Sequence, residues 1–265
     1  MTQLINYHNH TSLCGHAEGT LDDFIEEAIK QNFSEIGFSD HAPMPHPFQE
    51  GITMKPDEME LYINSVLEKQ NIYKDRISIK LGLEIDFPLY ETFNQKYLKD
   101  NRFDYLIGSC HIIDDWVFDY PGTVDEFEKR DINEIYKQYY AIIEETVESG
   151  YFQIIGHFDL VKKFGYRPTN NFTETYNRIA KKMSQKNIAF EVNTSGLLKP
   201  VKEIYPSRDL VKIFFENNVA VTMGSDTHYT EDFGYGYNTA IDMLKKSGYR
   251  SIRGFDKKKE YSITL

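Results

Sequence analysis

Histidines near the start of the chain are spaced as metal ligands are. His8 and His10 follow the apolar pair Leu4-Ile5, so this segment is expected to be a short buried strand that runs into a loop. Side chains alternate between the two faces of a strand, which puts His8 and His10 on the same side. His16 follows in a glycine-containing loop. Neutral imidazole is the commonest protein ligand of transition metals, so the chemistry indicated is metal binding.

An H-x-H pair alone also fits two half-exposed histidines at a strand end. The rest of the chain favours metal binding, because further candidate ligands each follow a short strand-like run. These are Asp40 with His41, Glu84, His111, His157, and Asp226 with His228. Only His46, in a proline-rich loop, breaks the rule. Imidazoles and carboxylates with no required thiolate suit zinc, manganese or iron better than calcium or magnesium.

Strand and helix patterns alternate along the chain and would position these residues. Strands are predicted over residues 3–8, 35–39, 77–84, 103–111, 152–157, 188–193 and 219–224. Helices are predicted over residues 20–32, 56–74, 90–99, 131–149, 173–186, 206–217 and 231–247, and a small hairpin or edge strands over 250–264. Thr20 is a good N-cap, Gly150 a C-cap, and Pro206 is expected at a helix start.

Two connecting segments are open to two interpretations each. Residues 42–55 form a long loop with prolines at 43, 45 and 47, which is either a lid over a site or a simple connection. Residues 112–121 form an aromatic and acidic excursion that contains the only tryptophan, Trp116. This excursion either walls a pocket or packs on the rim of the fold.

Seven strands that alternate with helices imply a parallel sheet. We predict that residues 1–265 form one α/β domain, a closed barrel with the metal site at the carboxyl ends of its strands. A doubly wound open sheet is the alternative. An open sheet would not easily bring ligands from five different strands to one point, whereas a closed barrel does so by its geometry.

Composition narrows the class of protein. The net charge of −11 disfavours a protein that coats long nucleic acid or anionic lipid, although a local basic pocket stays possible. No long apolar run suits a membrane span, and no signal segment precedes His8, so a reduced cytoplasmic protein is expected. Cys14 and Cys110 are too few for a disulfide framework, and we interpret neither as a metal ligand. The oligomeric state stays open.

The ligand pattern from His8 to His228 resembles the polymerase-and-histidinol-phosphatase (PHP) superfamily. Each piece of the pattern is weak, but the combination spans nearly the whole chain and is specific. The strings Gly156–Leu160, Glu191–Gly196 and Tyr205–Ser207 look like its histidinol-phosphate phosphatase branch. The resemblance implies a distorted (β/α)7 barrel that holds three divalent transition-metal ions.

The resemblance also implies which residues hold each ion. His8, His10, Glu84 and Asp226 would bind the first, and Glu84 would bridge to a second that His111 and His157 complete. The third would be held by His16, His41 and His228. Asp40 would orient the ligands around it rather than bind directly. Asp226, His228 and Glu84 are the predicted catalytic residues.

The substrate contacts are harder to assign, because one position departs from the branch. An arginine that binds phosphate is expected soon after the Asn-Thr-Ser-Gly string, but here Leu197-Leu198-Lys199 follows. Lys199 would substitute as a point charge without the bidentate fork of arginine. Lys162, Arg167 and Arg208 are the other candidates, and we interpret Lys163 as a surface cation. Glu18 is a candidate for the substrate ammonium, or else an ordinary loop residue.

The implied reaction is hydrolysis of the small phosphate monoester L-histidinol phosphate, by attack of a metal-bridging hydroxide on phosphorus. Three alternatives remain. A PHP-family nuclease or nucleotide phosphoesterase fits the ligands, although the acidic balance disfavours long nucleic acid. A non-catalytic metal-binding module would need a closed site. Amidohydrolase chemistry also uses H-x-H but leaves the cluster of His16, His41 and His228 without a purpose.

Overall fold

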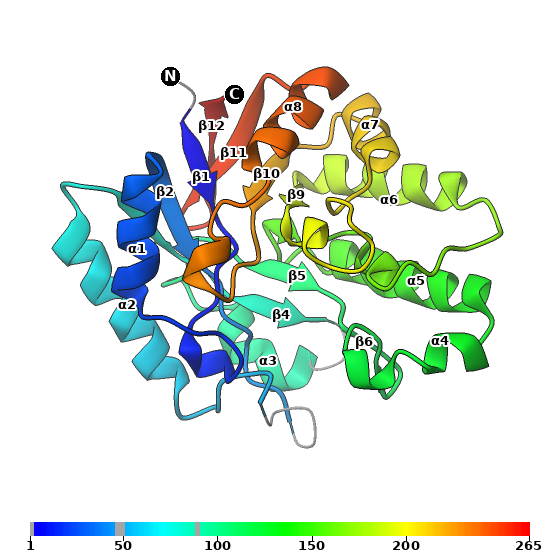
Figure 1. The fold of residues 1–265 in the computed structure, drawn as a ribbon, viewed down its shortest axis with the longest axis horizontal. Helices are drawn as coiled ribbons and strands as arrows, with labels where there is room; N and C mark the ends of the chain where they lie inside the picture. Colours follow the sequence, from blue (N-terminus) through cyan, green and yellow to red (C-terminus); the bar gives the residue numbers. More distant parts are fainter. Residues whose placement is uncertain (1–2, 46–50, 88–90) are drawn as a thin grey trace.

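Parallel strands form the centre of the molecule in this computed structural model, which describes residues 3–45, 51–87 and 91–265. One sheet has the order β1 (Leu4–Asn6), β2 (Phe33–Phe38), β3 (Ser78–Leu81). A second sheet has the order β10 (Val221–Gly224), β9 (Ala189–Asn193), β8 (Ile154–Ile155), β5 (Ile107–Ser109), β4 (Glu84–Asp86). All neighbouring strands within these two sheets run parallel (Figure 1).

The two sheets meet at both edges and close into a barrel. Only Gly82 and Leu83 separate β3 from β4, so one stretch of chain passes from the first sheet to the second. At the other edge, the backbone N–H of Tyr7 donates to the Met223 carbonyl at 3.0 Å, which joins β1 to β10. These two joints confirm the predicted distorted barrel of seven strand positions.

Helices surround the barrel, as Figure 1 shows for α1 and α2 on one side and α5 and α6 on the other. The helices are α1 (Leu21–Lys30), α2 (Met59–Tyr73), α3 (Glu91–Leu98), α4 (Glu126–Lys129), α5 (Ile132–Ser149), α6 (Thr173–Lys186), α7 (Arg208–Glu216) and α8 (Tyr237–Ser247). Thr20 caps α1 in a capping box with Asp23, and Gly150 ends α5 in the left-handed conformation, both as predicted. Among the described helices, none is long and apolar enough to cross a membrane.

Several predicted boundaries differ from the structure. The strand predicted over 77–84 is divided into β3 and β4. Of the strand predicted over 103–111, only Ile107–Ser109 forms a strand, β5. Pro206 precedes α7 instead of opening it, with Ser207 at the N-cap position. The helix predicted from residue 231 begins only at Tyr237, because Gly234 and Gly236 adopt positive φ and break the helical path before it.

The excursion over residues 112–121 contains a small antiparallel hairpin, β6 (Ile112–Ile113) and β7 (Trp116–Val117). The Trp116 ring packs edge-on against Phe127 of α4 with ring centroids 4.7 Å apart, so this residue anchors the excursion on the barrel rim. Ile112, Val117 and Asp119 of the same segment line a cavity, so both interpretations of it hold. The loop over 42–55 is described except for its residues 46–50, which include His46 and Pro47.

The chain ends in the predicted hairpin, formed by β11 (Ser251–Asp256) and β12 (Lys259–Thr264). Its turn lies beside Asp104, which precedes β5 and whose Oδ1 accepts a hydrogen bond at 3.0 Å from the backbone N–H of Lys257. The hydroxyls of Tyr7 and Tyr261 both donate to one oxygen of Glu35 at 2.5 Å. The hairpin therefore packs against the amino-terminal end of the barrel and leaves the opposite end free for a site.

Candidate metal centre

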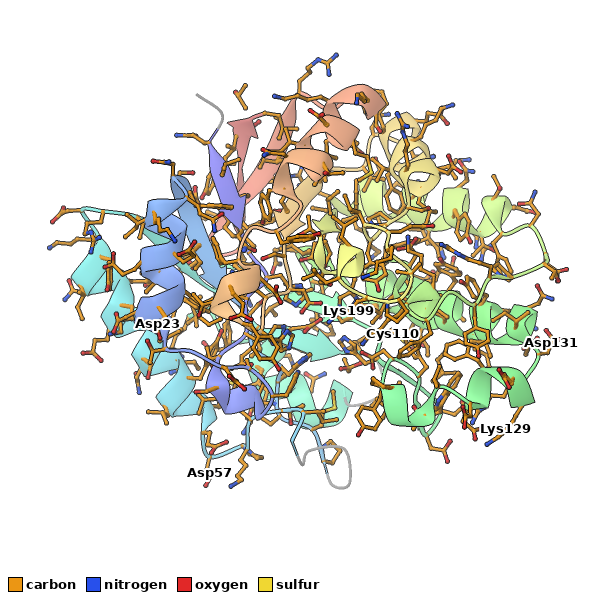
Figure 2. The ribbon with its side chains drawn as sticks, in the orientation of Figure 1. Asp23, Asp57, Cys110, Lys129, Asp131 and Lys199 are labelled. Atoms are coloured by element: carbon orange, nitrogen blue, oxygen red, sulfur yellow. The ribbon has the colours of Figure 1, made fainter. Side chains whose placement is uncertain are left out.

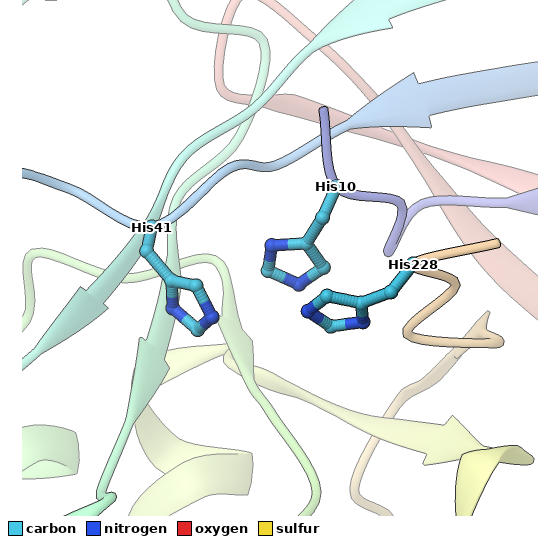
Figure 3. A group of neighbouring side chains, drawn as sticks. All are labelled: His10, His41 and His228. Atoms are coloured by element: carbon cyan, nitrogen blue, oxygen red, sulfur yellow. The ribbon is translucent and has the colours of Figure 1, made fainter. Parts of the chain in front are cut away.

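The nine residues predicted as metal ligands come together at the carboxyl ends of the barrel strands. His8 and His10 follow β1, His41 follows β2, Glu84 opens β4, His111 and His157 follow β5 and β8, and Asp226 and His228 follow β10. His16 comes from the loop after the short 3-10 helix η1 (Ser12–Cys14). Figure 3 shows three of these imidazoles, and the His10 ring centroid lies 4.4 Å from that of His41 and 4.1 Å from that of His228.

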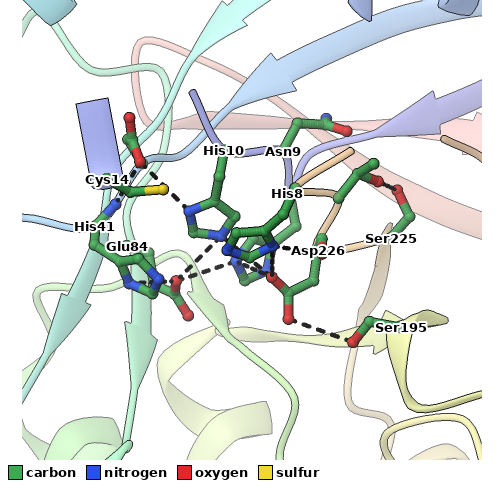
Figure 4. A network of polar contacts seen from close by, with 12 residues as sticks. His8, Asn9, His10, Cys14, His41, Glu84, Ser195, Ser225 and Asp226 are labelled. Carbon is green, nitrogen blue, oxygen red and sulfur yellow. Dashed lines mark hydrogen bonds and ion pairs between the residues drawn. The ribbon is translucent and has the colours of Figure 1, made fainter. Parts of the chain in front are cut away.

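Glu84 lies beside His41 in the network of Figure 4 and faces imidazoles with both of its oxygens. Its Oε2 lies 3.2 Å from Nε2 of His8, 3.6 Å from Nε2 of His10 and 3.0 Å from Nδ1 of His41. Its Oε1 lies 2.9 Å from Nε2 of His157. A single buried carboxylate therefore touches two groups of imidazoles, as a bridging ligand must.

Asp226, which follows β10, completes the first group, formed by His8, His10 and Oε2 of Glu84. Its Oδ1 lies 3.2 Å from Nε2 of His10 and 3.8 Å from Nε2 of His8. Its Oδ2 accepts a hydrogen bond at 3.3 Å from the hydroxyl of Ser195. The backbone of Asp226 has a φ of 49°, in the left-handed region that non-glycine residues seldom adopt. This conformation turns the side chain toward the histidines immediately after β10.

The second group consists of His111, His157 and Oε1 of Glu84. The Nε2 atoms of the two histidines lie 3.2 Å apart, and Nε2 of His111 lies 3.7 Å from Oε1 of Glu84. Two ring nitrogens and a carboxylate oxygen thus point at one small region. Such spacing is expected of ligands that share a single ion.

A third group gathers around His228. The structure places ligand atoms of His10, His41 and His228 within 4.8 Å of one another, and likewise those of Cys14, His16 and His228. Nδ1 of His16 donates to the Cys14 carbonyl and Nδ1 of His228 to the Asp226 carbonyl, each at 3.1 Å. These bonds leave Nε2 of both rings available. The sequence interpretation set Cys14 aside, but its thiol is buried at the edge of this group.

Burial and neighbouring imidazoles lower the pKa of His10, His16 and His228 and favour the neutral form that binds metal, whereas Glu191 and Glu84 raise the pKa of His8 against the effect of burial. Burial and the neighbouring His41 lower the pKa of His10 to about 3. Burial and His10 hold the pKa of His228 well below its usual value. The carboxylates are ionised: although burial alone would raise the pKa of Glu84, the charges of His8 and His41 hold it well below its usual range.

Buried polar atoms without hydrogen-bond partners test whether metal ions fit here. Nε2 of His8, Nε2 of His10, Nε2 of His228 and Oε2 of Glu84 have no such partner among the described residues. Unpaired buried polar atoms are costly, so a cluster of them that converges needs a further binding partner. All four are nitrogen or oxygen donors suited to zinc, manganese or iron, so the residues present fit divalent transition metals.

Two carboxylates that sequence reasoning did not select hold the histidines in place. Oε1 of the buried Glu191 accepts from Nδ1 of His8 at 2.8 Å, and Oε2 accepts from the backbone N–H of His157 at 3.0 Å. Oδ2 of Asp86 accepts from Nδ1 of His111 at 3.0 Å. Such carboxylates fix the tautomer and direct the other ring nitrogen at the metal. Their positions were a usable signal, since Glu191 interrupts the apolar run at the start of β9 and Asp86 follows Glu84 by two residues in β4.

Gly224 permits the close approach of Glu191. A Cβ atom at this position would lie 2.0 Å from Oε1 of Glu191 and 2.5 Å from Cβ of His8. Any larger residue would therefore displace the carboxylate that orients His8. The glycine was visible in the sequence, but its role depends on a contact between strands β9 and β10.

A cavity of about 330 Å³ opens beside the candidate metal ligands. Five histidines (His16, His41, His111, His157 and His228) line it together with apolar residues of several loops. Lys163 and Lys199 both line the cavity, and Figure 2 shows Lys199 near the middle of this face, away from Asp57 and Lys129 at the periphery. The interpretation of Lys163 as a surface cation is therefore wrong, because the structure places this residue in the cavity wall. Nζ of Lys163 donates to the Asp119 carboxylate at 3.0 Å and to its carbonyl at 2.6 Å.

The structure does not bring the other predicted substrate residues to this cavity. Lys162 is fully buried, and its Nζ lies 2.9 Å from Oδ2 of Asp159 and 3.1 Å from Oε2 of Glu203, so it serves a structural ion-pair network. Arg167 pairs with Glu203 at 2.7 Å, and both Lys162 and Arg167 line a separate hollow.

Arg208 and Glu18 are exposed. Arg208 is the first residue of α7 and is absent from the cavity lining. Glu18 lies at the rim, where its backbone N–H donates to the His228 carbonyl at 2.8 Å, but its side chain is not part of the lining. Neither position supports direct contact with a substrate that lies in the cavity.

Comparisons with known proteins agree with this geometry. The PHP domain family model matches residues 6–195. A probable histidinol-phosphatase of Deinococcus radiodurans is 36% identical over 95% of this chain and 96% of its own length. The histidinol-phosphatase of Lactococcus lactis is 26% identical over 95% of this chain and 94% of its own.

A solved structure extends the agreement to three dimensions. The histidinol phosphate phosphatase of Lactococcus lactis, in complex with zinc, L-histidinol and phosphate, superimposes with a TM-score of 0.83. It is 25% identical and covers 97% of this chain and 98% of its own. With the family match over most of the chain, the full-length relatives and the shared barrel, this chain belongs to the PHP domain family.

Proposed function

We propose that this protein is a metal-dependent histidinol-phosphatase, which hydrolyses L-histidinol phosphate to L-histidinol and phosphate in histidine biosynthesis. The observation that carries the proposal is the convergence of seven imidazoles, Glu84 and Asp226 at one end of the barrel, beside a cavity whose walls also hold Lys163 and Lys199. Relatives named histidinol-phosphatases match the chain over nearly its whole length. One of them was solved with zinc, L-histidinol and phosphate.

The ligand groups fit three divalent ions. His8, His10, Glu84 and Asp226 would hold the first, and Glu84 with His111 and His157 the second. His41 and His228, with His16, would hold the third. Bound ions of this type provide a hydroxide nucleophile near neutral pH and neutralise the charge of a phosphate group.

The chain's own residues prepare the site for that chemistry. Glu191 and Asp86 hold His8 and His111 so that their Nε2 atoms face the centre. Lys163 and Lys199 place positive charge on the cavity wall, where phosphate oxygens require it. Ser195 holds the carboxylate of Asp226 in the first ligand group. Ile112, Val117 and Leu160 line the cavity with apolar surface that excludes water from the reacting phosphate.

Phosphate release from histidinol phosphate, measured against other monoesters, nucleotides and a diester, tests the proposal. The protein is loaded in parallel with zinc, manganese or iron. We expect strong preference for histidinol phosphate and loss of activity in His8→Ala and Glu84→Ala. Metal-dependent hydrolysis that favours nucleotides would replace the substrate while keeping the site. Metal binding with no phosphoesterase activity would favour the binding-module alternative.

A further inference from the structure

The cavity lining contains one carboxylate that faces neither the imidazoles of the metal centre nor a cationic side chain. Three acidic residues line it: Asp119, Asp226 and Asp232. Asp226 faces the imidazoles, and Asp119 is paired with Lys163 at 3.0 Å. Asp232 is half-buried, and none of the ion pairs among the described residues includes it. A carboxylate without a cationic partner at the wall of a substrate cavity is suited to a cationic ligand group.

Tyr229 accompanies Asp232 on the same short segment. This segment follows the metal ligand His228 directly and forms the 3-10 helix η5 (Thr230–Asp232). The backbone N–H of Asp232 donates to the Tyr229 carbonyl at 2.9 Å, which holds the two residues in one turn. Tyr229 also lines the cavity, yet 42% of its surface is exposed. An exposed aromatic ring at the mouth of a cavity offers a flat surface to another ring.

We infer that Tyr229 and Asp232 form the subsite for the non-reacting end of the substrate. The Asp232 carboxylate pairs with the substrate ammonium, and the Tyr229 ring contacts its imidazole. The inference rests on the proposed function, because it assumes a phosphate monoester that carries both groups. It also replaces Glu18, which sequence reasoning selected for the ammonium, since Asp232 lines the cavity and Glu18 does not.

Steady-state kinetics with three substrates tests the two contacts separately. Histidinol phosphate carries the ammonium and the ring, phosphoethanolamine carries only the ammonium, and n-propyl phosphate carries neither. We expect Asp232→Asn to raise KM roughly tenfold for the first two substrates and to leave n-propyl phosphate unchanged, because a charge-assisted contact is lost. Tyr229→Leu should raise KM several-fold for histidinol phosphate alone. Glu231→Gln, an exposed acid next to Asp232 that does not line the cavity, is the matched control and should change nothing.

The outcomes separate this inference from the proposed function. Wild-type protein that shows no preference for histidinol phosphate over n-propyl phosphate would overturn both. A wild-type preference that survives Asp232→Asn, or one that Glu18→Gln removes instead, would overturn the inference alone. Equal losses on all three substrates would also overturn it, because they indicate a structural effect. Metal content and circular dichroism of each variant show whether the centre and the fold are intact.

Discussion

Replacement of Glu191 by glutamine tests how the protein orients its metal ligands. Oε1 of Glu191 accepts from Nδ1 of His8 at 2.8 Å. Oε2 accepts at 3.0 Å from the backbone N–H of His157 and at 3.0 Å from the side-chain amide of Asn193. A glutamine has one oxygen and one NH2 group. Whichever way its amide turns, the NH2 group therefore faces either the Nδ1–H of His8 or the N–H groups of His157 and Asn193, and two donors meet. The substitution keeps the size of the side chain and removes one acceptor and the negative charge.

The size of the effect follows from those three hydrogen bonds. A buried donor left without a partner costs about 1–3 kcal/mol. Loss of the carboxylate also makes His8 a weaker base and frees its ring, and such outer contacts usually contribute a factor of about 10–100 in metal affinity. That factor corresponds to about 1.4–2.8 kcal/mol of binding free energy. We therefore expect Glu191→Gln to bind zinc about 10–100-fold more weakly than the wild type.

Competition titration of the metal-free protein with a zinc chelator measures this affinity directly. Asp104→Asn is the matched control, because Asp104 is equally buried and accepts a hydrogen bond at 2.8 Å from the backbone of Leu81, far from the metal ligands. The control should lower the free energy of unfolding of the metal-free protein without changing zinc affinity. Wild-type zinc affinity in Glu191→Gln would refute the reasoning that this carboxylate positions His8.

Three further predictions concern other residues. Glu84→Gln should remove at least two bound ions and lower kcat more than about 10³-fold. Metal analysis and phosphate release measure these effects, and full metal content in the variant would contradict the bridging role of Glu84. Lys163→Met should raise KM for histidinol phosphate, whereas Lys162→Met should lower the free energy of unfolding by about 3 kcal/mol or more because the buried carboxylate of Asp159 loses its partner. Urea unfolding and kinetics distinguish the two variants, and equal behaviour would count against the roles assigned to these lysines. The hydrogen bond from Arg178 lowers the pKa of Glu144 to about 2, so this carboxylate stabilises the fold above its unfolded pKa of about 4.3, and the contribution is lost as pH falls from there toward 2. With solvent screening, we expect Glu144→Gln to lower the free energy of unfolding by about 1 kcal/mol at pH 7. Urea unfolding measures this loss, and a loss that does not shrink with falling pH would contradict the prediction.

The barrel and the convergence of the candidate metal ligands could be predicted because local patterns determine them. Each ligand follows a short apolar run, and parallel strands bring their carboxyl ends to the same edge of a sheet. The joint between β1 and β10 was implied by the ligands themselves, since His8 and Asp226 can share an ion only if the barrel closes. Strand lengths were less predictable, because the divided strand at Gly82 depends on a contact far away in the sequence. The Tyr105 ring packs against that glycine, where a Cβ would lie 2.3 Å from ring atoms.

The substrate contacts could not be predicted from charge alone. Lys162 and Lys163 are adjacent in the sequence, yet the 3-10 helix η3 (Leu160–Lys162) turns the first into a buried ion-pair network while the second lines the cavity. Which lysine reaches the substrate depends on this turn and on the carboxylates that the fold supplies. Likewise Asp232 fell within the helix predicted over 231–247, whereas the structure places it in η5 at the cavity wall. That residues 1–265 form one domain, and that the protein is cytoplasmic, stay predictions.

The joint between the first and last barrel strands has a consequence for the order of events during synthesis. His10 and Asp226 lie far apart in the sequence, although Nε2 of His10 is only 3.2 Å from Oδ1 of Asp226 in the folded protein. Contacts between such distant segments form late, because the loop between them must first be closed. A nascent chain would therefore hold His8 and His10 without the carboxylate that completes their ion site. Full metal retention thus reports that the barrel has closed.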